Sequence, residues 1–162
     1  MSTLTKSRIW LPLFAVMVYG IVREFKKESI WIFVGVALTV LFADQITSSI
    51  MKPFFERWRP SRDPELGPLV HTVGGYLGGK FGFASSHAAN SFGVALFLFL
   101  TTKSKVSWVW VMFIWAIIFS YSRIYLGVHY PGDIIVGASV GMFGAWLLAL
   151  LYNRNQNRLP FH

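Results

Sequence analysis

Residues 134–152 read IIVGASVGMFGAWLLALLY and include no charged side chain. The hydrocarbon core of a bilayer is about 30 Å thick, and a helix needs about 20 mainly apolar residues to cross it. The stretch from Ile134 to Tyr152 meets this requirement. It therefore predicts a membrane-spanning helix.

Four other blocks of apolar residues precede this stretch: Ile9–Val22, Ile30–Met51, Ala88–Thr102 and Val106–Tyr121. Apolar types make up 54% of the 162 residues and charged types 14%, against roughly a quarter charged in an ordinary soluble domain. We therefore expect an all-α, polytopic transmembrane helical bundle that forms a single domain over residues 1–162. It has five helices, or four plus one interfacial helix, because Ile9–Val22 is short for a membrane span.

The charge balance narrows the possible partners. The chain carries 15 Lys and Arg against 7 Asp and Glu, a net charge of +8. In so apolar a chain this excess favours anionic lipid headgroups or phosphate substrates, and no nucleic acid is expected because no basic tract is interleaved with aromatic residues. The absence of Cys excludes disulfides, thiolate catalysis and zinc ribbons. His, Asp and Ser side chains remain to carry any chemistry.

The connections between the apolar blocks alternate between two faces of the predicted bundle. Residues 51–88 and 121–134 then share a face with the N-terminus, and the C-terminus lies on the other. Lys and Arg are almost evenly divided between the two faces. When Lys52, Arg59 and Arg123 are set aside as candidate site residues, the remainder favours a cytoplasmic C-terminus by a narrow margin. The connection from Lys52 to Ala84 is rich in Pro and Gly, and connections of this length are usually lids, binding loops or disordered segments, of which a lid is favoured here. We expect a long loop over the active site.

A first group of charged residues follows the second apolar block, in the stretch Lys52–Pro60. Pro53 is compatible with a first helical turn, so a helix that begins near Lys52 would project Lys52 and Arg59 to the same side. Two converging cations suit a phosphoryl group. A solvated positive flank at a helix end is the alternative.

A second group, Ser85, Ser86 and His87, stands where the long loop becomes the third apolar block. Helix N-termini bind anions because their backbone N–H groups are unpaired and the helix dipole is positive there. His87 would point at the same spot. The alternative is that Ser85 or Ser86 simply caps the helix, which is compatible with anion binding.

The third group, Ser122–Asp133, joins the last two apolar blocks. A carboxylate on one ring nitrogen of a His fixes its tautomer and stabilises the positive charge that develops during catalysis. Asp133 follows His129 at a spacing that brings it into reach if the chain turns at Pro131–Gly132. Arg123 adds a planar donor for phosphate oxygens.

The three patterns are K-x6-R-P at Lys52–Pro60, S-S-H at Ser85–His87 and S-R-x5-H-x3-D at Ser122–Asp133. Together they resemble the type 2 phosphatidic acid phosphatase family of membrane lipid phosphatases, over roughly Ile30–Tyr152. The same signature occurs in soluble acid phosphatases and vanadium haloperoxidases. Order, spacing and position at the ends of predicted membrane helices all agree with the family.

The resemblance implies a metal-independent phosphohydrolase that needs no cofactor. His129 would attack phosphorus and form a phosphohistidine, while Asp133 holds its imidazole. His87 would protonate the leaving oxygen and then activate water for the second step. The phosphate oxygens would be bound by Lys52, Arg59, Ser85, Ser86 and Arg123.

The sequence departs from the family at two points. The usual second pattern is P-S-G-H, whereas this chain has Ala84-Ser85-Ser86-His87, so the set of phosphate donors differs and Ser86 can supply a hydroxyl. Members of the family commonly have six spans. We therefore expect either a shorter variant or a chain that lacks N-terminal residues.

The resemblance also implies the substrate and the location. The substrate would be a phosphorylated membrane lipid, with undecaprenyl diphosphate and phosphatidylglycerol phosphate ranked ahead of phosphatidic acid and the lipid A phosphates. The location would be the bacterial inner (cytoplasmic) membrane, with the active site facing the periplasm or exterior. Three alternatives are a non-enzymatic membrane protein that binds lipid phosphates, a vanadium-dependent oxidase that uses the same pocket, and a phosphate-binding transporter, which would need an internal repeat. The oligomeric state is not indicated.

Two further features of the sequence each have two possible interpretations. Asp44, inside the second apolar block, serves either the phosphate site or a hydrogen bond to a neighbouring helix. Gly137, Gly141 and Gly144 form either a dimer face or a surface for close packing within the bundle.

Overall fold

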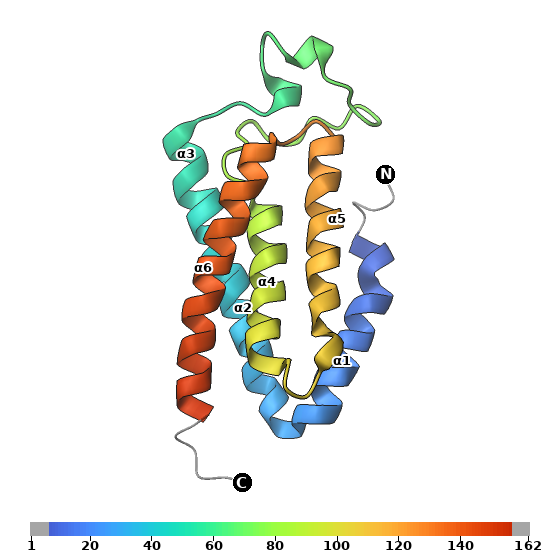
Figure 1. Ribbon diagram of the computed structural model, residues 1–162. Coiled ribbons are helices and arrows are strands. Elements are labelled where there is room, and N and C mark those ends of the chain that lie inside the picture. The colour runs from blue at the N-terminus through green and yellow to red at the C-terminus, as the bar shows by residue number, and fades with distance from the viewer. Residues whose placement is uncertain (1–6, 157–162) are drawn as a thin grey trace.

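The computed structural model describes residues 7–156 and confirms the all-α bundle (Figure 1). The long helices are α1 (Leu11–Phe25), α2 (Ser29–Asp44), α4 (Ser86–Thr102), α5 (Val111–Tyr125) and α6 (Pro131–Gln156). A π-helical stretch (Gln45–Met51) and the short α3 (Lys52–Phe55) extend α2. Single 3-10 turns lie at Ser7–Trp10, Lys26–Glu28, Pro60–Arg62, Gly67–Leu69 and Ser107–Trp110. Each predicted apolar block therefore lies largely within one of these long helical segments.

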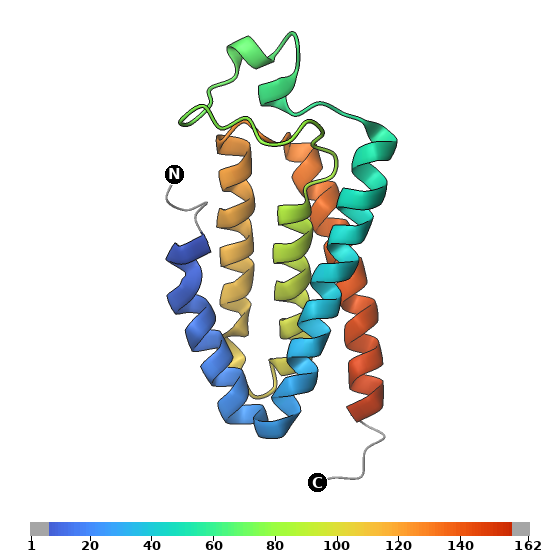
Figure 2. The same ribbon diagram turned by 180° about the vertical axis from the view of Figure 1, so that it is seen from behind.

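Three helical stretches are long and apolar enough to cross a membrane: Arg8–Phe55, Ser107–Tyr125 and Pro131–Gln156. The first reverses direction at Lys26–Glu28 and supplies both α1 and α2 (Figures 1 and 2). α1 runs alongside α5, and the rings of Phe14 and Trp115 meet at 5.1 Å between centroids. Because α1 follows the bundle rather than crossing its end, its direction agrees with the five-helix alternative.

The outer faces of the helices carry large apolar side chains. Trp31 and Leu41 on α2, Ile117 on α5 and Leu151 on α6 are all more than half exposed. A helix that is apolar on both its inner and its outer face is expected where lipid, rather than water, surrounds the protein.

The central helix α4 lies against α2, α5 and α6. The buried positions of its first half are small residues, which let neighbouring helices approach closely. A Cβ atom at Gly141 of α6 would collide with the backbone of Ala89, and one at Gly137 would collide with the backbone of Ser85. These glycines therefore serve packing within the bundle, and Gly144, whose Cβ would collide with Phe42, does the same.

The helix that carries Lys52 is the continuation of α2 and not a new helix. It ends after Phe55, because Glu56 adopts a left-handed conformation with φ of 44° and ψ of 26°. Arg59 lies beyond this end in extended backbone, with φ of −71° and ψ of 151°. The expectation that Lys52 and Arg59 project from one helix face was therefore wrong.

The loop between α3 and α4 lies across the end of the bundle where α5 joins α6 (Figures 1 and 2). Ser61 N donates to Gly127 O at 2.9 Å, which ties the loop to the α5–α6 connection. Gly127 has φ of 68°, and a Cβ there would come within 2.5 Å of Val70 in the loop, so this close approach needs a glycine. The loop covers the end of the bundle that carries the three sequence patterns.

Candidate active site

Three consecutive residues at the start of α4, Ser85–His87, join the sequence patterns. The backbone N–H of the first donates to Asp133 O at 3.0 Å. The hydroxyl of the second accepts a hydrogen bond from Lys52 Nζ, and Nε2 of the third pairs with Arg123 Nη2. Residues from α3, α4, α5 and α6 therefore meet at the N-terminus of one helix.

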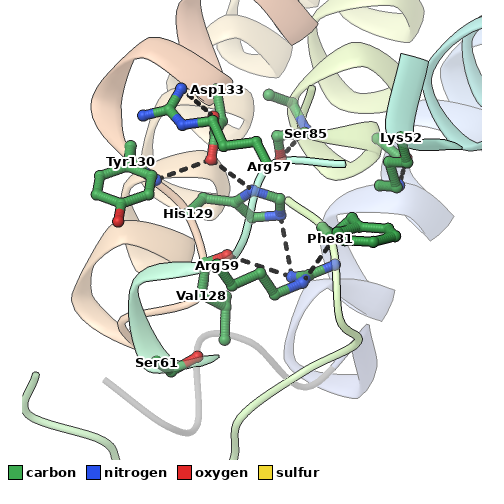
Figure 3. A network of polar contacts seen from close by, with 12 residues as sticks. Lys52, Arg57, Arg59, Ser61, Phe81, Ser85, Val128, His129, Tyr130 and Asp133 are labelled. Atoms are coloured by element: carbon green, nitrogen blue, oxygen red, sulfur yellow. Dashed lines mark hydrogen bonds and ion pairs between the residues drawn. The ribbon is translucent and has the colours of Figure 1, made fainter. Parts of the chain in front are cut away.

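His129 and Asp133 face each other at the start of α6 (Figure 3). Asp133 Oδ2 lies 3.3 Å from His129 Nδ1 and accepts a hydrogen bond from Tyr130 N at 2.9 Å. His129 is 2% exposed and Asp133 is fully buried. Because a carboxylate only accepts hydrogen bonds, it favours the tautomer of His129 with its proton on Nδ1. The lone pair of Nε2 is then available to attack an electrophile.

The surroundings of His129 favour its neutral form. Burial lowers the pKa of the His129 imidazole below its ordinary value of 6.5, and the positive charges of Arg59 and Lys52 add to this effect. The hydrogen bond with Asp133 acts in the opposite direction without reversing it. The neutral imidazole, which is the nucleophilic form, therefore predominates near neutral pH.

Arg59 approaches His129 from the long loop (Figure 3). Its Nη1 lies 3.3 Å from His129 Nε2 and donates to Val128 O, also at 3.3 Å. Its Nε donates to Phe81 O at 3.1 Å. These bonds fix a cation beside the ring nitrogen that is free to react.

Lys52 belongs to a hydrogen-bond network that includes Asp44, for which the sequence left a role in the phosphate site open. Its Nζ donates to Ser48 Oγ at 3.1 Å, and Ser48 Oγ donates to Asp44 Oδ1 at 3.0 Å. Thr47 Oγ1 lies 2.9 Å from Ser86 Oγ, the other acceptor of the lysine. The π-helical stretch brings these hydroxyls beside α4, and such stretches are frequent at functional sites. Asp44 thus supports the site through Ser48.

Arg57 is a further residue of the site that the sequence patterns did not predict. Its Nη1 lies 3.1 Å from Asp133 Oδ1, and its guanidinium carbon lies 4.3 Å from the centroid of the Tyr130 ring (Figure 3). Its place between Lys52 and Arg59 in the first pattern was the one signal that could have drawn attention to it.

Ser85 and Arg123, two of the expected phosphate ligands, differ in whether a hydrogen-bond donor remains free for phosphate. Ser85 is fully buried, its Oγ accepts from Ala88 N at 3.4 Å, and its N–H is taken by Asp133. Ser85 is thus the cap of α4, as one of the two interpretations predicted. Arg123 Nε, in contrast, is buried and has no hydrogen-bond partner among residues 7–156. An unsatisfied buried donor is costly, so it invites an acceptor such as a phosphate oxygen.

The arrangement suits phosphoryl transfer. It offers two imidazoles for nucleophilic and acid–base steps, and fixed cations for the charge on the phosphate oxygens. Within residues 7–156, no group of three His, Asp or Glu side chains is arranged so that it could hold a metal ion.

Residues 30–157, which make up more than half of the chain, match the PAP2 superfamily in sequence. The chain belongs to the PAP2 superfamily. The resemblance drawn from the three sequence patterns is confirmed, and so is the prediction of a multi-pass membrane fold. The protein is a PAP2 lipid phosphatase, so the non-enzymatic alternative does not hold.

Two curated relatives of this PAP2 phosphatase share more than a third of its residues. Lipid A 4'-phosphatase from Bacteroides thetaiotaomicron is 42% identical over 98% of this chain and 71% of the relative. Lipid A 4'-phosphatase from Porphyromonas gingivalis is 45% identical over 72% of this chain. This chain spans only 49% of the length of that second relative.

A solved structure shares the fold of this PAP2 phosphatase. It is the crystal structure of a transmembrane PAP2 type phosphatidylglycerolphosphate phosphatase from Bacillus subtilis. The two chains superpose with a TM-score of 0.59 at 25% identity, over 99% of this chain and 75% of the other.

Proposed function

We propose that this PAP2 phosphatase hydrolyses a phosphate monoester of a lipid A-type glycolipid. The two relatives named lipid A 4'-phosphatase are 42% and 45% identical to it, whereas the phosphatidylglycerolphosphate phosphatase of known structure is 25% identical. This difference in identity changes the ranking made from the sequence patterns, which placed undecaprenyl diphosphate and phosphatidylglycerol phosphate first. Lipid A phosphates now rank ahead of both.

The observation that carries the mechanism is the orientation of His129. Its Nδ1 faces the Asp133 carboxylate at 3.3 Å and its Nε2 faces Arg59 at 3.3 Å. In the first step Nε2 attacks phosphorus, and the bond between phosphorus and the lipid oxygen breaks. His87, which the negative charge of the bound phosphate keeps protonated, donates a proton to that oxygen. The dephosphorylated lipid leaves, and the phosphoryl group stays on His129.

The second step restores the enzyme. His87, now neutral, takes a proton from a water molecule, and the resulting oxygen attacks the phosphohistidine. The bond between nitrogen and phosphorus breaks and inorganic phosphate is released. Lys52, Arg59 and Arg123, together with Ser86 at the start of α4, hold the phosphate in both steps.

The phosphate clamp consists of Lys52, Arg59 and Arg123, with the hydroxyl of Ser86 between the lysine and α4. Lys52 and Arg59 are partly buried and Arg123 is buried, so the interaction of each with a phosphate oxygen is stronger than in water. Ser85 contributes by capping α4 and holding Asp133 in place. The proposed chemistry uses no metal ion.

Phosphate release from a panel of lipids in detergent tests this function. The panel contains a bisphosphorylated lipid A, phosphatidylglycerol phosphate, phosphatidic acid and undecaprenyl diphosphate, each assayed with EDTA. We expect the fastest release from lipid A, full activity in the chelator, and loss of nearly all activity in the His129→Ala and His87→Ala variants. His71→Ala, which changes an exposed histidine of the loop, is the matched control and stays active.

Each part of the proposal has its own contradicting result. Activity that survives His129→Ala ends the phosphohistidine mechanism, and activity abolished by EDTA ends its metal independence. Faster release from another lipid of the panel ends the choice of substrate. Release of phosphate by protein free of vanadium excludes the vanadium-dependent oxidase.

The proposed location is the bacterial inner membrane, with the active site on its outer face. The narrow excess of Lys and Arg on the side of the active site disappears when the cations of the phosphate clamp are set aside. The remaining Lys and Arg then favour a cytoplasmic C-terminus, which places the long loop outside.

A further inference from the structure

Arg57 makes two contacts that none of the three sequence patterns accounts for. Its Nη1 lies 3.1 Å from Asp133 Oδ1, and its guanidinium stacks over the Tyr130 ring at 4.3 Å from the centroid (Figure 3). Its backbone carbonyl accepts a hydrogen bond from Gly82 N at 2.9 Å. Both the main chain and the side chain of this arginine are therefore held in place beside the active site.

The two carboxylate oxygens of Asp133 have different partners. Oδ2 faces His129 Nδ1 and accepts from Tyr130 N, whereas Oδ1 accepts from Arg57. A carboxylate that is bound through both oxygens cannot rotate about its last bond without losing one of these contacts. Asp133 is fully buried although the Arg57 side chain is 44% exposed, so the loss of either contact leaves a carboxylate oxygen without its protein partner.

We propose that Arg57 is a positioning residue for the reaction, which fixes the Asp133 carboxylate and weakens the pull of its charge on His129. This inference rests on the proposed function, in which neutral His129 attacks phosphorus. Arg57 needs no contact with the substrate for this role, because it acts through Asp133.

The electrostatic effect has a defined sign. His129 is faced by Arg59 from the loop, Lys52 from α3, His87 from α4 and Asp133 from α6. Asp133 is the one negative charge in this group, and Arg57 lies on its far oxygen. Without that cation, the carboxylate attracts a proton to the imidazole more strongly. The pKa of His129 then rises, and less of the neutral nucleophile is present at a given pH.

The test compares Arg57→Gln with Arg57→Lys. Steady-state phosphate release from the same detergent-solubilised lipid phosphate gives kcat and KM, and kcat/KM is measured across the pH range. Comparison on one substrate cancels the ionisation of the substrate itself. For Arg57→Gln we expect about a tenfold loss in kcat and a KM within about twofold of wild type. We also expect the fall of kcat/KM on the acid side of its pH profile, the acid limb, to move to higher pH.

Arg57→Lys keeps the charge and loses the flat stack on Tyr130. Its acid limb is expected to stay close to that of wild type, while kcat falls by less than in Arg57→Gln. Arg62→Gln is the matched control, because Arg62 lies on the same loop, is exposed and donates to Gly78 O at 3.1 Å instead of to Asp133. Its kinetics are expected to equal those of wild type.

Three results would overturn the role of Arg57. They are an unchanged kcat and pH profile in Arg57→Gln, a rise in KM alone, and an acid limb that moves equally in Arg57→Lys. If Arg57→Gln does not fold in detergent, as judged by gel filtration and thermal unfolding, Arg57→Lys is compared with wild type. A lower kcat with an unmoved acid limb then supports the role, and an unchanged kcat or a moved acid limb overturns it. Failure of the proposed function is recognised separately, because it is measured on wild type and His129→Ala.

Discussion

Asp133 Oδ2 lies 3.3 Å from His129 Nδ1, and both side chains are buried at the N-terminal end of α6. This contact selects one tautomer of the imidazole and leaves the other ring nitrogen free to react. The backbone contributes as well, because Ser85 N holds the carbonyl of Asp133 at 3.0 Å. The nucleophile is therefore oriented by the helix packing that forms the bundle.

Replacing Asp133 by Asn tests this orientation. The amide can donate to Nδ1, which favours the tautomer with its proton on Nε2 and removes the reactive lone pair. We expect kcat to fall by roughly a hundredfold, with little change in KM because the cations of the clamp remain. Steady-state kinetics of phosphate release measure both constants. A rise in KM with unchanged kcat would contradict this role of Asp133.

Ser86 is expected to hold Lys52 in the clamp. Its hydroxyl accepts from Lys52 Nζ and contacts Thr47 and Ser48, so Ser86→Ala leaves the ammonium with fewer partners. A hydrogen bond to a charged group is worth about 1.5 kcal/mol or more, so we expect KM to rise roughly tenfold. Ser91→Ala is the matched control, since Ser91 is buried further along α4 and bonds to Ala88 O and Ser120. Equal effects of the two substitutions would argue against a specific role for Ser86.

Close packing of α6 on α4 makes Gly141 sensitive to substitution. A Cβ at this position would collide with the backbone of Ala89, which cannot move aside as a side chain can. We expect Gly141→Ala to destabilise the bundle by about 1–3 kcal/mol and to lower its Tm in detergent. Gly132→Ala provides the control, because a Cβ there meets nothing within 4 Å. If both variants melt like wild type, the two helices are less tightly packed than the structure indicates.

The parts of the fold and site that could be predicted depend on local sequence. Apolar blocks report membrane helices directly, because a span must satisfy its own backbone hydrogen bonds and face lipid. The contact between His129 and Asp133 was also predictable, since only the turn at Pro131–Gly132 separates the two residues. The catalytic roles assigned to these residues remain predictions.

The parts that were missed depend on contacts between distant segments. The left-handed conformation of Glu56 ends the helix before Arg59, and nothing in its residue type signals this. Arg57 looks like one more basic residue at a helix end until Asp133 comes beside it in three dimensions. Likewise, the glycines of α6 allowed two interpretations until α4 was seen against them.

The buried imidazole predicts how stability depends on pH. Burial lowers the pKa of His129 in the folded protein below the ordinary value of 6.5 that the unfolded chain retains. Below that value the unfolded state binds the proton more readily, so this contribution to stability is present above about pH 6.5 and is lost as the pH falls. Tm measured in detergent between neutral and mildly acid pH should therefore fall more for wild type than for His129→Gln. His71→Gln, at an exposed position, should follow wild type.

The membrane orientation can be tested by chemical labelling, because the chain contains no Cys and a single introduced thiol reports one position. The long loop and the C-terminal end of α6 lie at opposite ends of the bundle (Figure 1). Glu65 in the loop and Asn155 near the end of α6 are both exposed. A charged maleimide does not cross the bilayer, because desolvating its charge in hydrocarbon is costly. In intact spheroplasts we expect Glu65→Cys to be labelled and Asn155→Cys to react only after permeabilisation. The reverse pattern would place the site on the cytoplasmic face and limit its substrates to lipids of the inner leaflet.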